Sequence, residues 1–246
     1  MAEYLLWRHE LPGGAVTTVY ATRHERRTTR ARDVHFPQTE RLDFWCAANE
    51  VDEAIIAGFF VRDPYRPLGD LWIDGREVDH EPILPAYAPR RAAVVIEDGE
   101  IRLAARGDAP AVPVGDLVHA GPMLLRDGAV IFDREADVEG FSSGAGQFDS
   151  DITDGRYPRA ALGLSDDHLV AVACDGRRSR VDDGLTLPEL ADVLVRLGAR
   201  DAINLDGGGS TTLVHRRHLL NRPYSTQDQA APESRPIVSA LVFEPS

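Results

Sequence analysis

Lysine is absent from the 246-residue sequence, so all 27 basic residues are arginines. This absence excludes mechanisms that need a Schiff-base lysine or the lysine of a phosphate-binding P-loop. The two cysteines, Cys46 and Cys174, are too few for a disulfide framework or a zinc knuckle. Because each lies in an apolar run, we expect both to be buried free thiols in a protein from a reducing compartment.

Long apolar runs and a secretory signal are also missing. No segment approaches the ~20 apolar residues that cross a bilayer, and the N-terminus lacks a basic start followed by an apolar stretch. The formal net charge of −13 argues against nucleic-acid binding, which needs a basic surface. We therefore expect a cytoplasmic protein with neither membrane nor nucleic-acid partners, and the oligomeric state stays open.

Hydrophobic residues make up 43% and charged residues 27% of the chain, as in ordinary globular proteins. We expect one domain over residues 1–246, in which residues 1–49 form a strand, a basic loop and a helix. The basic segment 22–32 fits either an anion or partner surface, or a solvated loop beside a strand at 15–21. The solvated loop is the simpler interpretation.

Asp-Gly pairs punctuate the chain and predict β-hairpins at 71–78, 93–103 and 123–132, because this pair tolerates the positive φ of a type I′ turn. Helices are expected at 40–50 and, as the main one, at 187–197, where Thr186 and Glu189 form a capping box. Further strands are expected at 15–21, 53–57, 159–164, 168–174, 202–205, 211–215 and 237–243. The predicted fold class is α+β, with mixed, mostly antiparallel sheets and a strand–helix–strand crossover from 168–174 to 202–205.

Residues 202–214 carry the most informative motif, in which a strand leads into Asp206, three glycines and three hydroxyl residues. Glycines permit positive φ or let a ligand lie against bare backbone, and their amides can bind an anion such as phosphate. A glycine-rich hairpin is the alternative for the glycines alone. The acid and the hydroxyl groups favour a site formed by Asp206, Gly207, Gly208, Gly209 and Ser210.

Four other segments place charged or aromatic residues at strand ends. Arg159 heads one strand, Asp175 and Arg177 follow another, and Arg235 precedes the last strand; each could also belong to an ordinary salt bridge or turn. Gly58 and Phe59 suit either a sugar-stacking wall or core. Arginine binds phosphate through paired hydrogen bonds, and glycoside hydrolysis uses two carboxylates, so a sugar linked through phosphate would use both kinds of residue.

Together these motifs resemble the phosphodiester glycosidase family over about residues 50–243. The matching segments, in chain order, are Ala120–Pro122 with Asp127–Gly128, Pro158–Gly163, Asp175–Arg177, Asn204–Ser210 and Glu233–Pro236. The resemblance implies hydrolysis of a sugar 1-phosphodiester, of the N-acetylglucosamine-1-phosphodiester type, to free sugar and a phosphomonoester. With it we expect Asp206 and Asp175 as the catalytic carboxylates, and the arginines, the glycine run, Gly58 and Phe59 as substrate-binding residues.

Two departures from the family pattern keep a rival open. Ile56 stands where the family usually has asparagine, and Ala160 where it has threonine. A non-catalytic protein that binds glycans or sugar phosphates, or a glycosidase for another linkage, is therefore the alternative. No cofactor is firmly implied. The acidic stretch 149–155 lacks the spacing of an EF-hand loop, so a divalent cation is only a weak expectation and any metal need is unknown.

Overall fold

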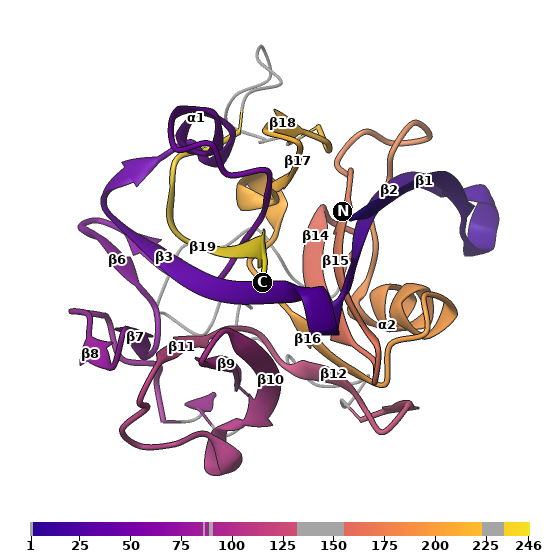
Figure 1. Ribbon diagram of the computed structural model, residues 1–246. Helices are drawn as coiled ribbons and strands as arrows, with labels where there is room; N and C mark the ends of the chain where they lie inside the picture. The colour runs from indigo at the N-terminus through magenta and orange to yellow at the C-terminus, as the bar shows by residue number, and fades with distance from the viewer. Residues whose placement is uncertain (1, 86, 89–90, 132–154, 223–233) are drawn as a thin grey trace.

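The computed structural model describes residues 2–85, 87–88, 91–131, 155–222 and 234–246 of the chain (Figure 1). The largest sheet has seven strands, in the order β1 (Glu3–Glu10), β2 (Val16–Glu25), β15 (His168–Cys174), β14 (Arg159–Leu164), β16 (Asp201–Asn204), β12 (Met123–Arg126) and β13 (Ala129–Val130).

Two five-stranded sheets and a two-stranded ribbon accompany it. One sheet has the order β18 (His218–Leu219), β17 (Leu213–His215), β4 (Glu53–Ile56), β19 (Ile237–Pro245) and β3 (Thr29–Glu40). The other runs β10 (Glu100–Ala105), β9 (Ala92–Glu97), β11 (Asp116–His119), β7 (Leu71–Ile73) and β8 (Arg76–Glu77). The ribbon pairs β5 (Phe60–Arg62) with β6 (Tyr65–Pro67).

The α+β prediction is only partly right, because the fold is largely β. The described residues contain two α-helices, α1 (Leu42–Ala48) and α2 (Leu187–Arg196), and every strand pair within their sheets is antiparallel rather than mixed. The expected crossover does exist. Helix α2 joins β15 to β16, which run in the same direction, but β14 lies between them and keeps each contact antiparallel.

Helix α2 forms where its capping box and apolar face predict it. The Thr186 amide donates to Glu189 Oε2 at 2.9 Å, and the Glu189 amide donates back to Thr186 Oγ1 at 3.3 Å. Leu190, Val193 and Leu194 lie on one face and are fully buried. They pack against the outer face of the seven-stranded sheet, so α2 covers the layer that holds β14 and β15 (Figure 1).

All three Asp-Gly pairs form hairpin turns in the structure. The aspartates have φ of 51°, 52° and 51° and the glycines 70°, 77° and 80°, in Asp74–Gly75, Asp98–Gly99 and Asp127–Gly128. Positive φ at both central residues is the geometry of a type I′ turn. The hairpins β7–β8, β9–β10 and β12–β13 therefore confirm the prediction.

The N-terminal prediction of one strand and a basic loop is wrong. Segment 22–32 lies in β2 and β3, joined by the short 3-10 turn Arg26–Thr28, and β1 precedes them. In β3, Ala31 and Asp33 are buried while Arg30 is exposed and Arg32 is intermediate. Arginine covers one face of an antiparallel strand as readily as it occupies a loop, so charge alone misidentified the segment.

The main core lies between the three larger sheets. It contains Leu162 and Ala171 from the seven-stranded sheet, Ile55 and Leu241 from the sheet of β4 and β19, and Val94 from the sheet of β9. A second core fills the space beneath α2. Both cysteines are buried and free, as predicted.

Candidate functional site

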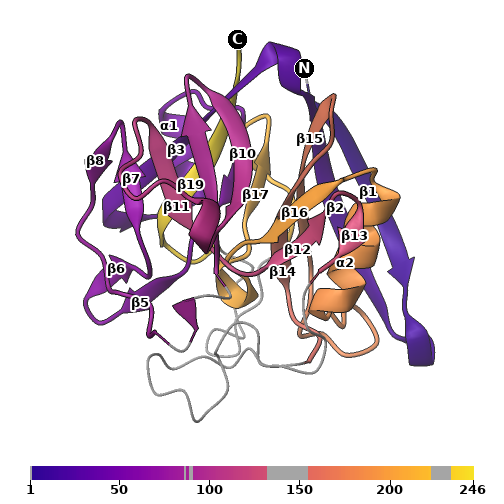
Figure 2. The same cartoon turned by 90° about the horizontal axis from the view of Figure 1, so that it is seen from below.

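The candidate site lies at one edge of the seven-stranded sheet, where β15 and β16 end and β14 begins. Because β15 and β16 run in the same direction, Asp175 and the turn at Asp206 follow strand ends on this edge. Arg159, the first residue of the antiparallel β14, lies between them and pairs with Cys174. The turn after β16 lies beside the start of β14 in the lower half of Figure 2. The topology thus brings Arg159, Asp175 and Asp206, which span 47 positions along the chain, to the same edge of the sheet.

Asp206 opens a tight, buried turn. Its Oδ1 accepts the Gly207 amide at 2.9 Å, and its own amide donates to the Ala57 carbonyl at 3.1 Å. The Gly208 amide donates to the Pro158 carbonyl at 2.8 Å, and the Ser210 amide to the Gly207 carbonyl at 3.1 Å. Three amides of the run are therefore engaged within the protein. They fix the turn, and they are not the open anion-binding nest that the sequence suggested.

The glycines of this turn are needed for close approach. Gly208 has a φ of +60°. A Cβ on Gly209 would lie 2.7 Å from Arg235 Nη2, and one on Gly207 would lie 2.9 Å from the Pro158 carbonyl oxygen. The guanidinium of Arg235 therefore lies against bare backbone at Gly209, so the structure brings Arg235 to the glycine run as expected.

Arg159 and Arg177 form a cationic group around Tyr157. The Cζ atoms of Arg159 and Arg177 lie 5.6 and 5.8 Å from the centre of the Tyr157 ring. Arg159 is buried, and its Nε donates to the Leu185 carbonyl at 3.1 Å while its Nη2 lies 3.4 Å from the Gly155 carbonyl. Arg177 is partly buried and has a φ of +63°. Two of the predicted phosphate-binding arginines thus come together, around a ring that the sequence analysis had not singled out.

Asp175 is held on the other face of the same sheet. Its Oδ2 accepts the Tyr20 hydroxyl at 2.9 Å and its Oδ1 accepts the Arg222 amide at 2.6 Å. Tyr20 belongs to the main core, whereas Cys174, the residue before Asp175, packs beneath α2 with the face that carries Arg159. Burial raises the pKa of Asp175 to about 6 against the lowering effect of these two hydrogen bonds.

Gly58 and Phe59 follow Ala57 directly, and Phe59 packs in a small buried cluster with Leu68 and Ile83. A Cβ on Gly58 would lie 2.6 Å from the His119 carbonyl oxygen, so only glycine fits there without a shift. Phe59 is 5% exposed, and the buried Arg91 guanidinium lies 4.5 Å from the centre of its ring. The carbonyl of Ala57, two residues before Phe59, accepts the Asp206 amide, which links this segment to the acid.

Ile56, the main departure from the family pattern, is fully buried in the main core. Its amide donates to the Thr212 carbonyl at 3.0 Å, so its backbone holds the segment after the glycine run. Ala160, the second departure, is also fully buried there. Both positions carry apolar side chains that pack well where they stand.

Two residues at the site were not named as site residues from the sequence. Asn204 is buried at the end of β16, and its Nδ2 lies 2.7 Å from where a Cβ on Gly121 would be. An amide inside an otherwise apolar strand was a signal that could have found it. Tyr157 carried no such signal, because its contacts with Arg159 and Arg177 depend on how β14 and β15 are packed.

Some predicted elements lie outside the described residues. These are Glu233 and the acidic stretch 149–155 apart from Gly155. Among the residues that the structure describes, no group of three or more His, Cys, Asp and Glu side chains is arranged to hold a metal ion. In the same residues, no helix combines the length and the apolar character needed to span a bilayer.

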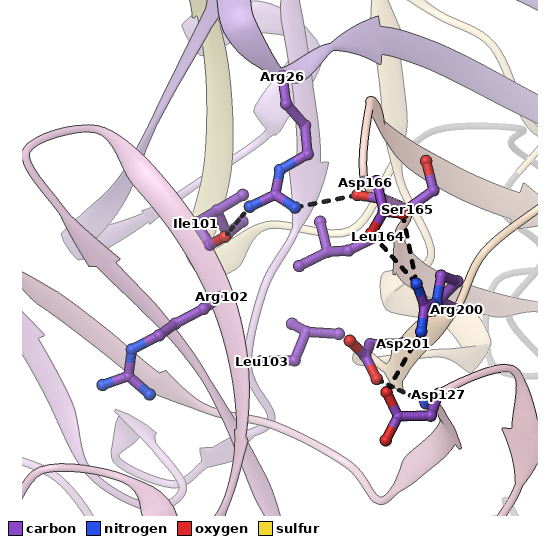
Figure 3. Close-up of a pocket in the computed structure, with 10 residues that line it drawn as sticks. All are labelled: Arg26, Ile101, Arg102, Leu103, Asp127, Leu164, Ser165, Asp166, Arg200 and Asp201. Atoms are coloured by element: carbon purple, nitrogen blue, oxygen red, sulfur yellow. Dashed lines mark hydrogen bonds and ion pairs between the residues drawn. The ribbon is translucent and has the colours of Figure 1, made fainter.

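A cavity of about 240 Å³ lies at the opposite edge of the seven-stranded sheet, where β14 ends and β16 begins (Figure 3). Arg26 donates from it to the Ser165 carbonyl at 2.9 Å and to the Ile101 carbonyl at 3.1 Å. Arg200 pairs with Asp166 at 3.3 Å and with Asp127 at 3.6 Å. The six residues of β14 separate this cavity from Arg159 by roughly 17 Å, so it is not part of the candidate site.

The family model described as phosphodiester glycosidase matches residues 49–244 of the chain. The match spans the glycine run, the three arginines and both candidate carboxylates. No curated protein matches.

Solved structures with the same fold share low sequence identity with the chain. The catalytic domain of zebrafish N-acetylglucosamine-1-phosphodiester alpha-N-acetylglucosaminidase, auto-inhibited by its pro-peptide, gives a TM-score of 0.71 at 20% identity over 99% of this chain and 83% of that one. A hypothetical protein from Synechocystis gives 0.62 at 19% identity, over 98% and 62%. A protein from Burkholderia pseudomallei, provisionally described as exported, gives 0.68 at 18% identity, over 95% and 75%.

Proposed function

Because the chain belongs to the phosphodiester glycosidase family, we propose that it hydrolyses the glycosidic bond of a sugar 1-phosphodiester, of the N-acetylglucosamine-1-phosphodiester type. Water adds to C1 of the sugar, the bond from C1 to the bridging oxygen breaks, and that oxygen leaves with the phosphate as a phosphomonoester. One observation carries this proposal: the turn at Asp206 and the guanidinium groups of Arg159, Arg177 and Arg235 lie at one edge of one sheet.

In this proposal Asp206 is the first catalytic carboxylate, acting as base or nucleophile at C1. The three arginines hold the phosphate and stabilise the negative charge that it gains as the bond breaks. Gly207, Gly208, Gly209 and Ser210 shape the pocket, and Gly58 and Phe59 form the facing wall. The free sugar is one product and the phosphomonoester the other.

Asp175 is proposed as the second carboxylate, with a smaller role. A pKa of about 6 suits a general acid. However, both oxygens of Asp175 accept protein hydrogen bonds, and a phosphomonoester leaving group, whose second pKa is about 6, needs less protonation than an alcohol does. We therefore expect the arginines, rather than proton transfer from Asp175, to provide most of the stabilisation of the leaving phosphate.

The second candidate is a non-catalytic protein that binds sugar phosphates or glycans on the same scaffold. Ile56 favours it, because the side chain at the family's asparagine position cannot donate a hydrogen bond. A small-molecule substrate in the cytoplasm, without a required cofactor, remains part of the proposal, as does the absence of nucleic-acid and membrane partners.

The product distinguishes these functions. Purified protein is incubated with UDP-N-acetylglucosamine and a panel of sugar 1-phosphate esters, with and without EDTA, and the products are identified by mass spectrometry. Free sugar with a phosphomonoester is expected, and sugar 1-phosphate would indicate cleavage at phosphorus instead. Saturable binding by calorimetry with no product across the panel would support the binding protein. Loss of product with EDTA would show a metal requirement.

A further inference from the structure

Tyr157 links two arginines that come from different segments of the chain. Arg159 is the first residue of β14, and Arg177 lies in the turn after β15. Their Cζ atoms lie 5.6 and 5.8 Å from the centre of the Tyr157 ring, within the range of cation–π attraction. The Arg159 Nε also donates to the Leu185 carbonyl, which fixes one edge of that guanidinium. The ring is thus the shared contact of both cations.

The backbone around Tyr157 is closely enclosed, which sets the position of the ring. Its amide donates to the Leu185 carbonyl at 3.2 Å and its carbonyl accepts the Leu185 amide at 3.0 Å. A Cβ on Gly184 would lie 2.5 Å from the Tyr157 carbonyl, and one on Gly176 would lie 2.9 Å from the same carbonyl carbon. A Cβ on Gly155 would lie 3.1 Å from the ring itself. Tyr157 therefore occupies space that is open only because positions 155, 176 and 184 are glycines.

We propose that Tyr157 is a positioning residue for the phosphate group, whose ring holds the guanidinium groups of Arg159 and Arg177 together so that both act on one phosphate. Two guanidinium cations repel each other, and the electron-rich face of an aromatic ring offsets that repulsion. Tyr157 acts through the arginines and does not take part in bond breaking. The inference rests on the proposed function for the identity of the bound group.

The test separates the ring from the hydroxyl and from the bulk of the side chain. Affinity for inorganic phosphate is measured by calorimetry, and KM and kcat on whichever ester the protein hydrolyses. Tyr157→Leu is expected to weaken phosphate binding and raise KM by about five- to thirty-fold, with a smaller fall in kcat, because two cation–π contacts that hold the arginines are lost. Tyr157→Phe, which keeps the ring, is expected to stay within about two-fold of the wild type. Tyr65→Leu, at a 48% exposed tyrosine on β6, is the matched control and should change neither value.

Fluorinated phenylalanines at position 157 nearly keep the shape of the ring, and each added fluorine weakens the negative electrostatic potential of its face. Phosphate affinity should fall stepwise as fluorine atoms are added, and this series answers the question even if Tyr157→Leu does not fold. In an Arg177→Gln background, Tyr157→Leu should cost less than in the wild type, because one of its two partners is gone. Wild-type phosphate affinity in Tyr157→Leu, equal losses in Tyr157→Phe and Tyr157→Leu, or no trend with fluorination would each overturn the positioning role.

The measurements also keep this inference apart from the proposed function. Phosphate binding that depends on the Tyr157 ring, without turnover of any ester, contradicts the glycosidase and leaves the positioning role intact. Turnover with full phosphate affinity in Tyr157→Leu contradicts the positioning role alone. If the wild-type protein binds no phosphate, the positioning role fails, and the product assay alone decides whether the protein is a glycosidase.

Discussion

The two edges of the seven-stranded sheet both carry arginines and aspartates, which are buried at one edge and exposed at the other. At the edge where β14 begins, Arg159, Asp175 and Asp206 are buried, with exposures of 2%, 2% and 9%. At the edge where β14 ends, Arg200 is paired with Asp127 and Asp166, and the side chains of all three are more than half exposed. The ~240 Å³ cavity is at the exposed edge. Burial therefore distinguishes the two edges, because charge acts strongly only where water is excluded.

The largest expected effect separates the two ends of one strand, β16. Asp206→Asn should lower kcat by about 10²- to 10⁴-fold, since it removes the proposed catalytic carboxylate while keeping its shape. Asp201→Asn, at the start of the same strand, is the matched control and should leave kcat unchanged. Steady-state kinetics on the hydrolysed ester measures both. Comparable rates in the two variants would remove Asp206 from the mechanism.

A smaller loss is expected from Gly209→Ala. The added Cβ would lie 2.7 Å from Arg235 Nη2, so this guanidinium must move. We expect KM to rise by about ten-fold, and the free energy of unfolding to fall by about 1–3 kcal/mol from overpacking. Gly128→Ala lies at the opposite edge, where a Cβ meets nothing within 4 Å but φ is +80°, so it strains the backbone without touching an arginine. An unchanged KM in Gly209→Ala would show that Arg235 does not bind substrate.

Asp175→Asn tests the buried acid through its pH dependence. The folded pKa of about 6 lies above the ordinary value of 3.8, so the folded state holds a proton that the unfolded state has lost between these two pH values. The contribution of Asp175 to stability is therefore greatest below pH ~4, and falls by up to about 3 kcal/mol as pH rises to 6. Asparagine cannot titrate, so urea unfolding of this variant should show a shallower fall across that window. If the variant and the wild type showed the same pH dependence of the free energy of unfolding, groups other than Asp175 would determine it.

The smallest effect is expected at the exposed edge. Arg200→Ala breaks contacts with Asp127 and Asp166, but exposed ion pairs contribute little. The free energy of unfolding should change by less than about 1 kcal/mol, and kcat and KM should stay at wild-type values. A large loss of activity here would instead make the cavity in Figure 3 a functional site.

The sequence predicted local structure well where one residue type dictates one geometry. Asp-Gly turns, the Thr186–Glu189 cap and the apolar strands 159–164 and 168–174 were all placed correctly. It failed over segment 22–32, because arginine is compatible with both a loop and the outer face of a strand. At the site, residue type pointed to Asp206 and the arginines, but the partners of Tyr157 depend on packing.

By itself the sequence determined the family and the glycine run that Arg235 approaches, because both depend on residue types at fixed spacing. Tertiary structure alone decided that β14 lies between β15 and β16, which places Arg159 beside the ends of both strands. It also decided that Asp175 faces Tyr20 across the sheet from Arg159, and that three amides of the glycine run donate within the protein. Strand order, the face on which a side chain lies and the partner of each amide are set by contacts between distant segments, which no local pattern encodes.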